Sequence, residues 1–504
     1  MVIVKMQTKT NLFVTVEAAT LLPHLQTFLA YHDIEAYFVG GFVRDGLLGK
    51  PNHDIDLAVF GDAVSIAKQA ADVLNGHFVL LDELHQVARV VLSPNEERWY
   101  LDFASMRGPI EEDLAKRDFT IDAIAVRPGQ MEAGWNRVKV TDPLDGIGDL
   151  ERRLVRAASD SAFADDPARL LRAFRLAAEF GFSIDAQTES IIERDNELIT
   201  GVSGERIREE LGHILETDQA AKTLRHLDRL GIFDLLFPEM SASKGVEQPK
   251  EHFWDVFEHS METVAAVEQL LTELNSKNGL LELLSFRDEL REHFEEKVSN
   301  GLRRGALIKI AALLHDVAKP QTKSFDAQKG KFRFLGHAPQ GAKIAEAILE
   351  RLRFSSREKG AVTRIIDQHL RPGHLSNAHE LPTRRAIYRY FRDTGDVGID
   401  TLFLSLADHL ATRGPSLEAE GWQKHVQVTQ YMLAKRLEEG VVVSPPKLLD
   451  GHVLISEFGL APGPEIGKLL ETIREAQASG EIESKEDALD FVRKELDRKY
   501  ANQR

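Results

Sequence analysis

The pattern of hydrophobic and polar residues divides the chain into two unequal parts. Up to about residue 126, short apolar runs with alternating polar positions predict strands, with a helix from about Asp62 to Leu74 between the second and third. The predicted strands lie in AYFVG (36–40), DIDLAVF (54–60), HFVLL (77–81), VARVVL (87–92) and WYLDFASM (99–106). This mixture predicts an α/β sheet unit near the N-terminus.

The strand signals stop after Thr141, and stretches with helical periodicity follow, such as PARLLRAFRLAAEFGF (167–182) and ERIREELGHILE (205–216). Residues 241–250, 414–421 and 441–447 are rich in Gly, Pro and small polar residues, which predicts boundaries there. We therefore expect an α+β chain with an α/β head and a small mixed sheet. The head covers residues 1–150, and all-α regions cover 151–245, 246–415 and 416–504.

Composition narrows the range of functions. The 504 residues include 63 Lys and Arg against 80 Asp and Glu, a net charge of −17, so any polyanion must bind a local basic patch. The absence of cysteine excludes disulfides, zinc knuckles and thiol nucleophiles, so any metal must be bound by His and carboxylates. Without a signal peptide or an apolar run of 18 residues, we expect a cytoplasmic protein that does not contact membranes.

The first group of candidate residues lies in YFVGGFVRDGLLGKPNHDIDLAVFG (37–61). Gly40 and Gly41 follow a predicted strand, and glycines let backbone N–H groups approach a phosphate at the start of the next helix. Asp54 and Asp56 stand two positions apart on a strand, so both carboxylates face the same side. With Asp102 they suit two Mg²⁺ ions placed between an attacking hydroxyl and a leaving pyrophosphate.

A family resemblance rests on the order of these motifs. The run GGFVRD, the Asp54/Asp56 pair, KRDFT (116–120) and DDPARLLRAFRLAAEFGF (165–182) resemble class II tRNA nucleotidyltransferases and bacterial poly(A) polymerases over about the first 240 residues. The resemblance implies a polymerase β-like head that extends RNA 3′ ends without a template. It implies that Asp54 and Asp56 bind metal, and that the nucleotide contacts are Gly40, Gly41, Arg44, Asp45, Arg107, Arg117 and Asp118.

In that superfamily the motif Glu-Asp-x-x-Arg reads the Watson–Crick edge of the incoming base. Here the matching residues are Asp165, Asp166 and Arg169, and the first side chain is one methylene shorter than the family's. A carboxylate can accept from the exocyclic amino group of C or A, while the guanidinium donates to a ring nitrogen or carbonyl. The alternative is a set of exposed charges at the start of an amphipathic helix.

Between Arg107 and the EEDLAKRDF motif (111–119), this chain has only Gly108, Pro109 and Ile110. Full CCA-adding relatives carry a longer flexible segment here, which is associated with the switch from C to A addition. The short interval therefore resembles enzymes that add only the two C residues. Alternatively, another loop has taken over the role.

A second group of candidate residues lies in the helical part. The segment ALIKIAALLHDVAKP (306–320) places His315 beside Asp316 in an apolar helix, where both are costly to bury unless a metal or hydrogen bonds satisfy them. With His259, His337, His369 and Asp408 on other predicted helices, this order resembles the HD-domain metal phosphohydrolases. Six such groups suffice for one or two ions of Mn, Fe, Ni, Co or Zn. The alternative is a module that keeps only the fold.

Two regions are candidates for RNA contacts. Residues 351–392 contain ten Lys or Arg against three Asp or Glu, which predicts a phosphate track that includes Arg384 and Arg385. The alternative is a basic surface that pairs with acidic neighbours. Residues 448–495 resemble the C-terminal segment of bacterial CCA-adding enzymes, where Gly463 and Gly467 would begin a helix that holds a backbone phosphate near Lys468.

We therefore expect a template-independent nucleotidyltransferase that adds C, A or both to tRNA 3′ ends from CTP and ATP. The resemblances imply Mg²⁺ at the transferase site and a transition metal at the HD site. There the implied reactions are phosphatase and 2′,3′-cyclic phosphodiesterase action on RNA ends. No obligate protein partner is inferred. The alternatives are a CC-only enzyme, a poly(A) polymerase, or a protein that is chiefly an HD phosphohydrolase.

Overall fold

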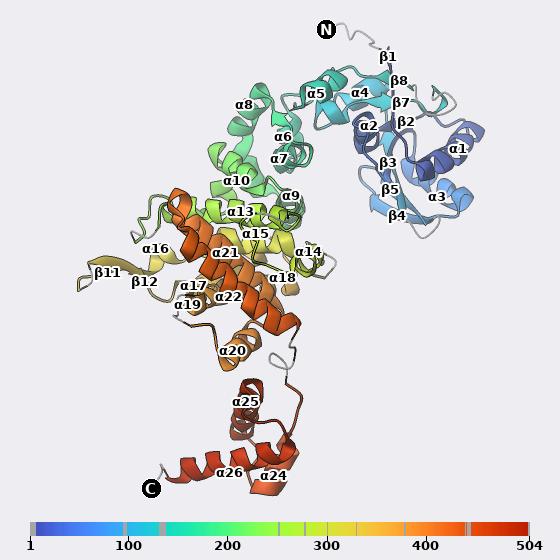
Figure 1. Cartoon of the computed structure of the whole chain (residues 1–504). Helices are drawn as coiled ribbons and strands as arrows, with labels where there is room; N and C mark the ends of the chain where they lie inside the picture. Colours follow the sequence, from blue (N-terminus) through green and yellow to red (C-terminus); the bar gives the residue numbers. More distant parts are fainter. Residues whose placement is uncertain are drawn as a thin grey trace. The chain divides into compact units, whose positions relative to one another are not determined.

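The computed structural model describes residues 7–93, 98–130, 138–249, 252–276, 279–299, 301–328, 330–376, 380–438, 440 and 445–501. The chain forms two compact units, one of residues 1–202 with 230–232 and one of residues 203–229 with 233–504 (Figure 1). The division therefore falls inside the segment 151–245. Of the boundary predicted at 441–447, residues 441–444 lie outside the described residues.

The first unit is built on a sheet that, within the described residues, has eight strands in the order β1-β8-β7-β2-β3-β6-β5-β4. All neighbouring strands run antiparallel except β3 and β6, which are parallel. This small mixed sheet confirms the predicted fold class. The strands are β1 (Gln7–Thr10), β2 (Ala36–Val39), β3 (Asp54–Phe60), β4 (His77–Asp82), β5 (Val87–Leu92), β6 (Trp99–Met106), β7 (Ala125–Val126) and β8 (Val138–Thr141).

Alternation on β3 and β6 explains how the sheet exposes its carboxylates. Ile55, Leu57 and Val59 point into the core from β3, whereas the two aspartates of that strand face the other side. On β6, Trp99, Leu101 and Phe103 are buried in the same way. One face of these paired strands therefore packs, and the opposite face is left for chemistry.

Helices complete the first unit. Helix α2 follows β2 without a break, and α3 begins at the side chain of Asp62, which accepts hydrogen bonds from the first-turn amides. A short parallel pair, β9 with β10, is not signalled by the sequence pattern. The elements are α1 (Val16–Tyr31), α2 (Gly40–Leu47), α3 (Ala63–Leu74), α4 (Ile110–Leu114), α5 (Gly146–Arg152), β9 (Leu154–Val155), α6 (Ala162–Asp165), α7 (Arg169–Phe180), β10 (Ser183–Ile184) and α8 (Ala186–Asp195).

The second unit is a helical bundle around the apolar helix α15, in which every residue from Ala306 to Leu314 is buried. Helices α13, α18 and α21 pack against it. The hairpin β11–β12 is a second strand pair without a sequence signal. The elements are α9 (Gly204–Glu216), α10 (Ala220–Arg229), α11 (Ile232–Leu236), α12 (Pro238–Ser241), α13 (Val256–Glu273), α14 (Arg287–Glu295), α15 (Arg304–Leu314), α16 (Lys319–Thr322), β11 (Lys323–Asp326), β12 (Lys331–Phe334), α17 (His337–Arg351), α18 (Ser356–Gln368), α19 (Leu370–Ser376), α20 (Arg384–Thr394), α21 (Gly398–Arg413) and α22 (Ala419–Leu437).

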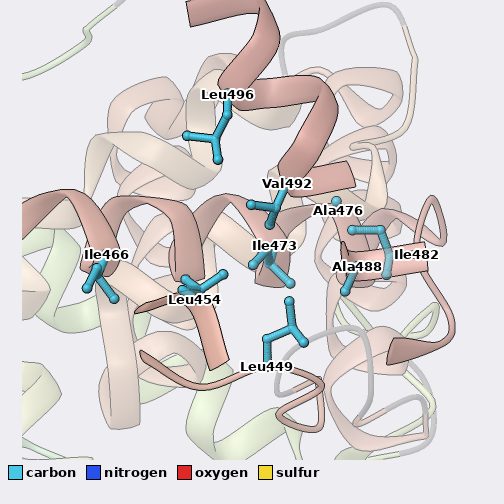
Figure 2. Packing of buried hydrophobic residues seen from close by; sticks show 9 residues of the cluster. All are labelled: Leu449, Leu454, Ile466, Ile473, Ala476, Ile482, Ala488, Val492 and Leu496. Carbon is cyan, nitrogen blue, oxygen red and sulfur yellow. The ribbon is translucent and has the colours of Figure 1, made fainter. Parts of the chain in front are cut away.

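The C-terminal helices α24 (Gly451–Phe458), α25 (Pro464–Ser479) and α26 (Lys485–Ala501) enclose an apolar core of their own. Figure 2 shows side chains from all three helices and from the preceding segment gathered around Ile473. Leu454, Ala476, Ala488 and Val492 are fully buried there. None of the helices in the described part of the chain is both long and apolar enough to span a lipid bilayer.

Candidate functional site

The first candidate site lies on the open face of β3 and β6. Asp54 and Asp56 stand on β3, and the parallel register places Asp56 directly beside Asp102 on β6. Paired residues of neighbouring strands point to the same face, so the three predicted carboxylates share one surface.

The paired glycines lie against Asp56. The amide of Gly41 donates to Asp56 Oδ2 at 3.0 Å. Gly40 has φ +62°, a left-handed conformation that favours glycine, and a Cβ there would lie 2.8 Å from Asp56 Oδ2 and 3.3 Å from Arg117 Nη1. The glycine turn, the metal-binding candidate and the KRDFT arginine therefore meet at one point.

Asp102 is held by Arg89, a residue that the sequence reasoning missed. Arg89 lies opposite Asp102 on β5 and donates through Nε and Nη2 to its two oxygens, both at 2.7 Å. Such a bidentate pair fixes the carboxylate and offsets its charge. Asp102 thus completes the acidic face but, unlike Asp54 and Asp56, has a strong cationic partner.

This surface fits divalent metal ions. Burial raises the pKa of Asp56 to about 6; Arg117 opposes the shift and Asp102 adds to it. The pKa of Asp54 is also raised, chiefly by burial. Carboxylates that crowd together in this way are stabilised by a cation among them, and oxygen ligands are those that Mg²⁺ prefers.

The triphosphate candidates Arg44 and Asp45 are tied into a network. Buried Arg44 donates from Nε to Asp45 Oδ1 at 2.8 Å and from Nη1 to Asp122 Oδ1 at 2.7 Å. Asn52 donates to the other oxygen of Asp45 at 2.7 Å. The structure therefore adds Asn52 and Asp122 as support for the glycine turn.

Charged residues of α7 and α4 contact the neighbouring residues Arg117 and Asp118. Arg172 on α7 lies 2.9 Å from Asp118 Oδ2, and Arg117 donates to Asp113 on α4 at 3.2 Å. Burial alone would raise the pKa of Asp118, but Arg172 and Arg169 outweigh it and lower the pKa. Arg107, by contrast, is exposed at the end of β6.

The residues proposed to read the base lie where α6 ends and α7 begins. Arg169 donates to the carbonyl of Lys116 at 3.3 Å, which ties α7 to the KRDFT segment. Asp165 is exposed and accepts from Ser161 Oγ at 3.0 Å, and Asp166 accepts from the amide of Ala168 at 3.2 Å. Arg169 is therefore brought to the KRDFT segment, whereas the contacts of Asp165 and Asp166 are local, and the roles of all three stay predictions.

In the second unit, the predicted HD residues converge from separate helices. The first trio has His259 Nε2 at 3.1 Å from Asp408 Oδ1 and at 3.2 Å from His315 Nε2. Ligand atoms of these three residues all lie within 4.8 Å of one another.

The second trio comprises Asp316, His337 and His369. His337 Nε2 lies 3.3 Å from Asp316 Oδ1 and 3.4 Å from His369 Nε2. Asp316 also joins the two trios, because its Oδ2 lies 3.1 Å from His315 Nε2. All six predicted residues are thus brought together.

Three of the histidine rings are oriented in the same way, with Nδ1 against a backbone carbonyl three residues earlier. Because a carbonyl only accepts, Nδ1 carries the proton and Nε2 keeps a free lone pair, as a metal ligand requires. The pairs are His315 with Ala312 (2.8 Å), His337 with Phe334 (2.7 Å) and His369 with Ile366 (2.6 Å).

The cluster fits metal ions. Unprotonated Nε2 atoms of His337 and His369 only 3.4 Å apart repel unless a cation lies between them. Burial lowers the pKa of His369 to about 3, so this ring is neutral. Asp316 Oδ2 is paired with Lys319 Nζ at 2.5 Å, and among the described residues its Oδ1 faces the Nε2 atoms of His337 and His369. Imidazole with carboxylate is a donor set for divalent transition metals.

A cavity of about 510 Å³ opens onto this centre and is lined by Asp316, His337, His369 and Asp408. His252, which the sequence reasoning missed, lies in its wall with its ring centroid 5.2 Å from that of His259. Burial lowers the pKa of His252 to about 3. It stands in a loop, seven positions before His259, and only that spacing could have pointed to it.

The basic stretch 351–392 is largely paired with acidic residues. Arg385 donates to Glu481 at 2.7 Å, and Arg389 holds Glu475 bidentately on α25. Arg392 donates to Glu471 at 2.7 Å. These contacts favour the alternative of a basic surface facing acidic neighbours, and RNA binding by Arg384 and Arg385 stays a prediction.

The residues of the predicted phosphate site in the C-terminal helices are exposed to solvent. Gly463 precedes α25, and Gly467 and Lys468 follow in its first turns, all exposed. A Cβ at either glycine would meet no described atom within 4 Å. The surface is therefore accessible, and its role stays a prediction.

Comparisons with known proteins identify three regions. Residues 36–156 match the family model described as "Poly A polymerase head domain", and residues 181–244 match "Probable RNA and SrmB- binding site of polymerase A". Residues 256–413 match the HD domain. The two candidate sites fall in the first and third of these regions.

Similar solved structures support the fold. A CCA-adding enzyme in its apo form I has a TM-score of 0.63 at 22% identity, with 95% of this chain and 94% of that chain covered. The Thermotoga maritima CCA-adding enzyme complexed with tRNA has a TM-score of 0.61 at 22% identity, with 97% and 100% covered.

Curated relatives match nearly the whole chain. The A-adding tRNA nucleotidyltransferase of Deinococcus radiodurans is 32% identical, over 91% of this chain and 95% of the relative. The CC-adding tRNA nucleotidyltransferase of Thermus thermophilus is 32% identical, over 92% and 94%. The CC-adding enzyme of Geobacter sulfurreducens is 30% identical, over 94% and 95%. The chain therefore belongs to the family of tRNA nucleotidyltransferases, and it carries an HD domain in residues 256–413.

Proposed function

We propose that this chain adds nucleotides to the 3′ end of tRNA without a template. The observation that carries the proposal is the shared face of Asp54, Asp56 and Asp102 beside the Gly40-Gly41 turn. Relatives over nearly the whole chain are tRNA nucleotidyltransferases, which favours tRNA as the substrate. Such a substrate also favours a cytoplasmic location.

The reaction joins the RNA 3′ hydroxyl to the α-phosphate of a nucleoside triphosphate, and pyrophosphate leaves. Asp54 and Asp56 would hold Mg²⁺, with Asp102 as a third ligand. When bound, the ions neutralise charge on the attacking and leaving oxygens. The amide of Gly41 and the guanidinium of Arg117 meet at Asp56, where they can orient the triphosphate.

The experiment uses tRNA that lacks its last three nucleotides. Purified full-length protein is incubated with this tRNA, Mg²⁺ and labelled CTP or ATP, and the products are sized on a gel. Asp56→Asn should abolish extension while tRNA still binds in a gel-shift assay. Full extension by this variant would refute the assignment, and long A tails on unstructured RNA would instead indicate a poly(A) polymerase.

A specific observation favours CC addition. Strand β6 ends at Met106 and α4 begins at Ile110, so only Arg107, Gly108 and Pro109 connect them. Three residues are too few for a mobile segment that could move the base-reading residues from a position that binds C to one that binds A. Relatives with the CC-adding name come from three organisms, which supports the same proposal.

Two substrates separate the possibilities. On tRNA without its last three nucleotides, CTP alone should give a product longer by two. On tRNA that already ends in CC, ATP should give no product. Efficient A addition to that second substrate would contradict the CC-only proposal and leave nucleotidyl transfer itself intact.

For the second unit we propose a metal-dependent phosphohydrolase that acts on phosphate esters such as those at RNA ends. The two trios of ligands carry this proposal. A bound transition metal would supply an activated water at neutral pH. His315, His337 and His369 would present Nε2 to it because their Nδ1 atoms are already engaged.

The test uses two substrates with added Ni²⁺ or Mn²⁺. It measures hydrolysis of the cyclic phosphodiester of 2′,3′-cyclic AMP and release of inorganic phosphate from RNA with a terminal phosphate. Asp316→Asn should remove this activity. A protein that binds metal but hydrolyses neither substrate would leave the domain as a scaffold.

A further inference from the structure

Strand β3, which carries two of the candidate metal ligands, begins where the sheet has lost a neighbour. In the register of β2 with β3, Val39 pairs with Asp56, and β2 ends at Val39. Asp54, two residues earlier on β3, therefore has a strand beside it only on the β6 side, where it lies opposite Tyr100. On its other side, the sheet does not fix the position of this candidate ligand.

The side chain of Asn52 takes the place of the missing strand. The peptide group between His53 and Asp54 points its carbonyl toward β6, where it accepts from the amide of Tyr100 at 3.0 Å. Because the C=O and N–H of a trans peptide point in opposite directions, the Asp54 N–H faces the side on which β2 has ended. There it donates to Asn52 Oδ1 at 2.7 Å. Asn52 thus fixes the backbone from which the Asp54 carboxylate projects.

Asn52 is itself held by the helix that contains the glycine turn. Its Nδ2 donates to Asp45 Oδ2 at 2.7 Å, and the other oxygen of Asp45 accepts from Arg44 Nε at 2.8 Å. Arg44 in turn donates to buried Asp122 at 2.7 Å. The side chains of Arg44 and Asp45 are only 10% and 14% exposed, so water competes little for these bonds. The hydrogen bonds therefore connect α2 to the first residue of β3.

The two partners of Asn52 require an amide between them. The carboxylate of Asp45 only accepts, so it faces Nδ2, and the backbone N–H of Asp54 only donates, so it faces Oδ1. A carboxylate at position 52 would face that of Asp45, and an alanine would lose both bonds. A Cβ on Gly41 would lie 3.6 Å from Asn52 Nδ2 and 3.6 Å from Asp56 Oδ2. The amide therefore lies where the turn, the helix and the strand meet.

We propose that Asn52 is a positioning residue for nucleotidyl transfer, which sets the affinity of the site for Mg²⁺ by holding the backbone of Asp54. It acts through Asp54 and keeps that carboxylate in a fixed place relative to α2. Groups that orient a metal ligand in this way typically contribute about 10- to 100-fold to metal affinity or activity. This inference rests on the proposed nucleotidyl transfer, in which Asp54 holds Mg²⁺.

Binding of CTP without RNA gives the first test, because no nucleotide is transferred. Full-length protein is titrated with CTP by calorimetry, once with Mg²⁺ and once with EDTA. Asn52→Ala should weaken binding about 10-fold in Mg²⁺ and less than about 3-fold in EDTA, because the glycine turn stays in place. An unchanged affinity in Mg²⁺, or an equal loss under both conditions, would overturn the proposal.

A second test exchanges the two side chains. Asp45→Asn replaces one of two accepting oxygens by a donor, and Asn52→Asp places two carboxylates face to face. Each variant alone should weaken Mg²⁺-dependent CTP binding about 10-fold or more. In the double variant Asp45→Asn/Asn52→Asp, the amide at position 45 donates to the carboxylate at position 52, which still accepts from the Asp54 N–H. Its affinity should return to within about 3-fold of wild type. A double variant no better than either single variant would contradict the proposed contact.

The matched control is Asn196→Ala. It removes an amide that donates to the carbonyl of Leu230 at 3.1 Å elsewhere in the same unit. CTP binding in Mg²⁺ should be unchanged in this variant. The bond from the Asp54 N–H is exposed, so water can replace Asn52 there. Asn52→Ala should therefore lower the midpoint of thermal unfolding no more than the control does.

Primer extension separates this inference from the function on which it rests. If wild type extends tRNA that lacks its last three nucleotides, Asn52→Ala should raise the Mg²⁺ concentration for half-maximal rate about 10-fold. The rate at saturating Mg²⁺ should stay within about 3-fold of wild type. Extension with an unchanged Mg²⁺ requirement would refute the role of Asn52 but keep nucleotidyl transfer. Weaker Mg²⁺-dependent CTP binding by the variant, with no extension by wild type, would do the reverse.

Discussion

Gly40 and Asp56 lie so close that a single methyl group on Gly40 would displace the Asp56 carboxylate. A Cβ on Gly40 would lie 2.8 Å from Asp56 Oδ2, and its φ of +62° is unfavourable for any other residue. The carboxylate that we propose as a metal ligand therefore depends on the absence of a side chain at the preceding turn.

We expect Gly40→Ala to reduce nucleotide addition by about 10-fold or more, because it moves the Asp56 carboxylate as well as straining the backbone by about 1–2 kcal/mol. Gly49→Ala is the matched control, since φ is +71° there but a Cβ would meet no described atom within 4 Å. Both variants should lose similar stability in thermal unfolding, and only the first should lose activity. Equal activities would contradict the geometric explanation.

Variants of Arg89 and Asp102 show whether Asp102 binds Mg²⁺ or serves only as the ion-pair partner of Arg89. Asp102→Asn should lower kcat about 100-fold and raise the Mg²⁺ concentration needed, because about 2.7 kcal/mol of charge stabilisation is lost. Arg89→Met keeps the carboxylate, so we expect a smaller loss. Primer-extension rates over a Mg²⁺ titration measure both. Identical effects would show that Asp102 acts only through Arg89.

Metal binding by the HD centre should be visible in the stability of the protein. An ion present at about 100 times its Kd adds roughly 2.7 kcal/mol to the folded state, which raises the midpoint of thermal unfolding by several degrees. His369→Gln should diminish the increase that Mn²⁺ or Ni²⁺ causes. His425→Gln is the control, because His425 is equally buried but bonds to Ser376 and Ser405. Equal metal-induced increases in both variants would disprove the ligand role of His369.

The ion pairs between α20 and α25 should be weak and sensitive to salt. Arg389 and Glu475 form two hydrogen bonds, but nearly half of the Arg389 side chain is exposed. A double-mutant cycle with Arg389→Ala and Glu475→Ala should give a coupling of about 0.5–1 kcal/mol at low salt, falling as ionic strength rises. Coupling of zero at every salt concentration would show that the pair contributes nothing to the packing of these helices.

Buried Glu358 should make the second unit lose stability in acid. It accepts from Arg208 at 2.8 Å and from the amide of Ser355 at 2.8 Å. Burial acts to raise its pKa, but Arg208 and the hydrogen bonds outweigh burial and lower it. The pair therefore stabilises the fold above the ordinary pKa of a glutamate, and this contribution disappears as pH falls through the lowered value.

Glu358→Gln should consequently reduce the free energy of unfolding at pH 7, by about 1–3 kcal/mol. The difference from wild type should shrink as the pH falls toward 3, measured by urea unfolding at each pH. A difference that does not change with pH would mean that the charge of Glu358 has no role.

Sequence periodicity predicted the sheet because its central strands bury every second residue. On β3, Ile55, Leu57 and Val59 are fully buried, whereas Asp54 is exposed and Asp56 half-buried, which is the alternation visible in the sequence. The hairpin β11–β12 carries no such signal, because KSFD and KFRF are mostly exposed or half-buried. Without an alternating buried face, a local pattern does not reveal that these two strands pair.

Motifs predicted the residues of both sites better than their partners. Asp56 and Asp102 were found from the motif and strand patterns, but Arg89 is a partner only because of a cross-strand register. His252 stands in a loop whose path brings it to His259. Contacts of this kind depend on three-dimensional placement, so the sequence alone does not reveal them.

Three histidines of the HD centre, His315, His337 and His369, are oriented by backbone carbonyl groups three residues earlier in the chain. An arriving ion thus meets rings whose rotation is already restricted, and little reorganisation accompanies its capture. We expect one transition metal to replace another without remodelling the bundle, so that the supply of ions in the cell, more than the shape of the protein, decides which one is found there.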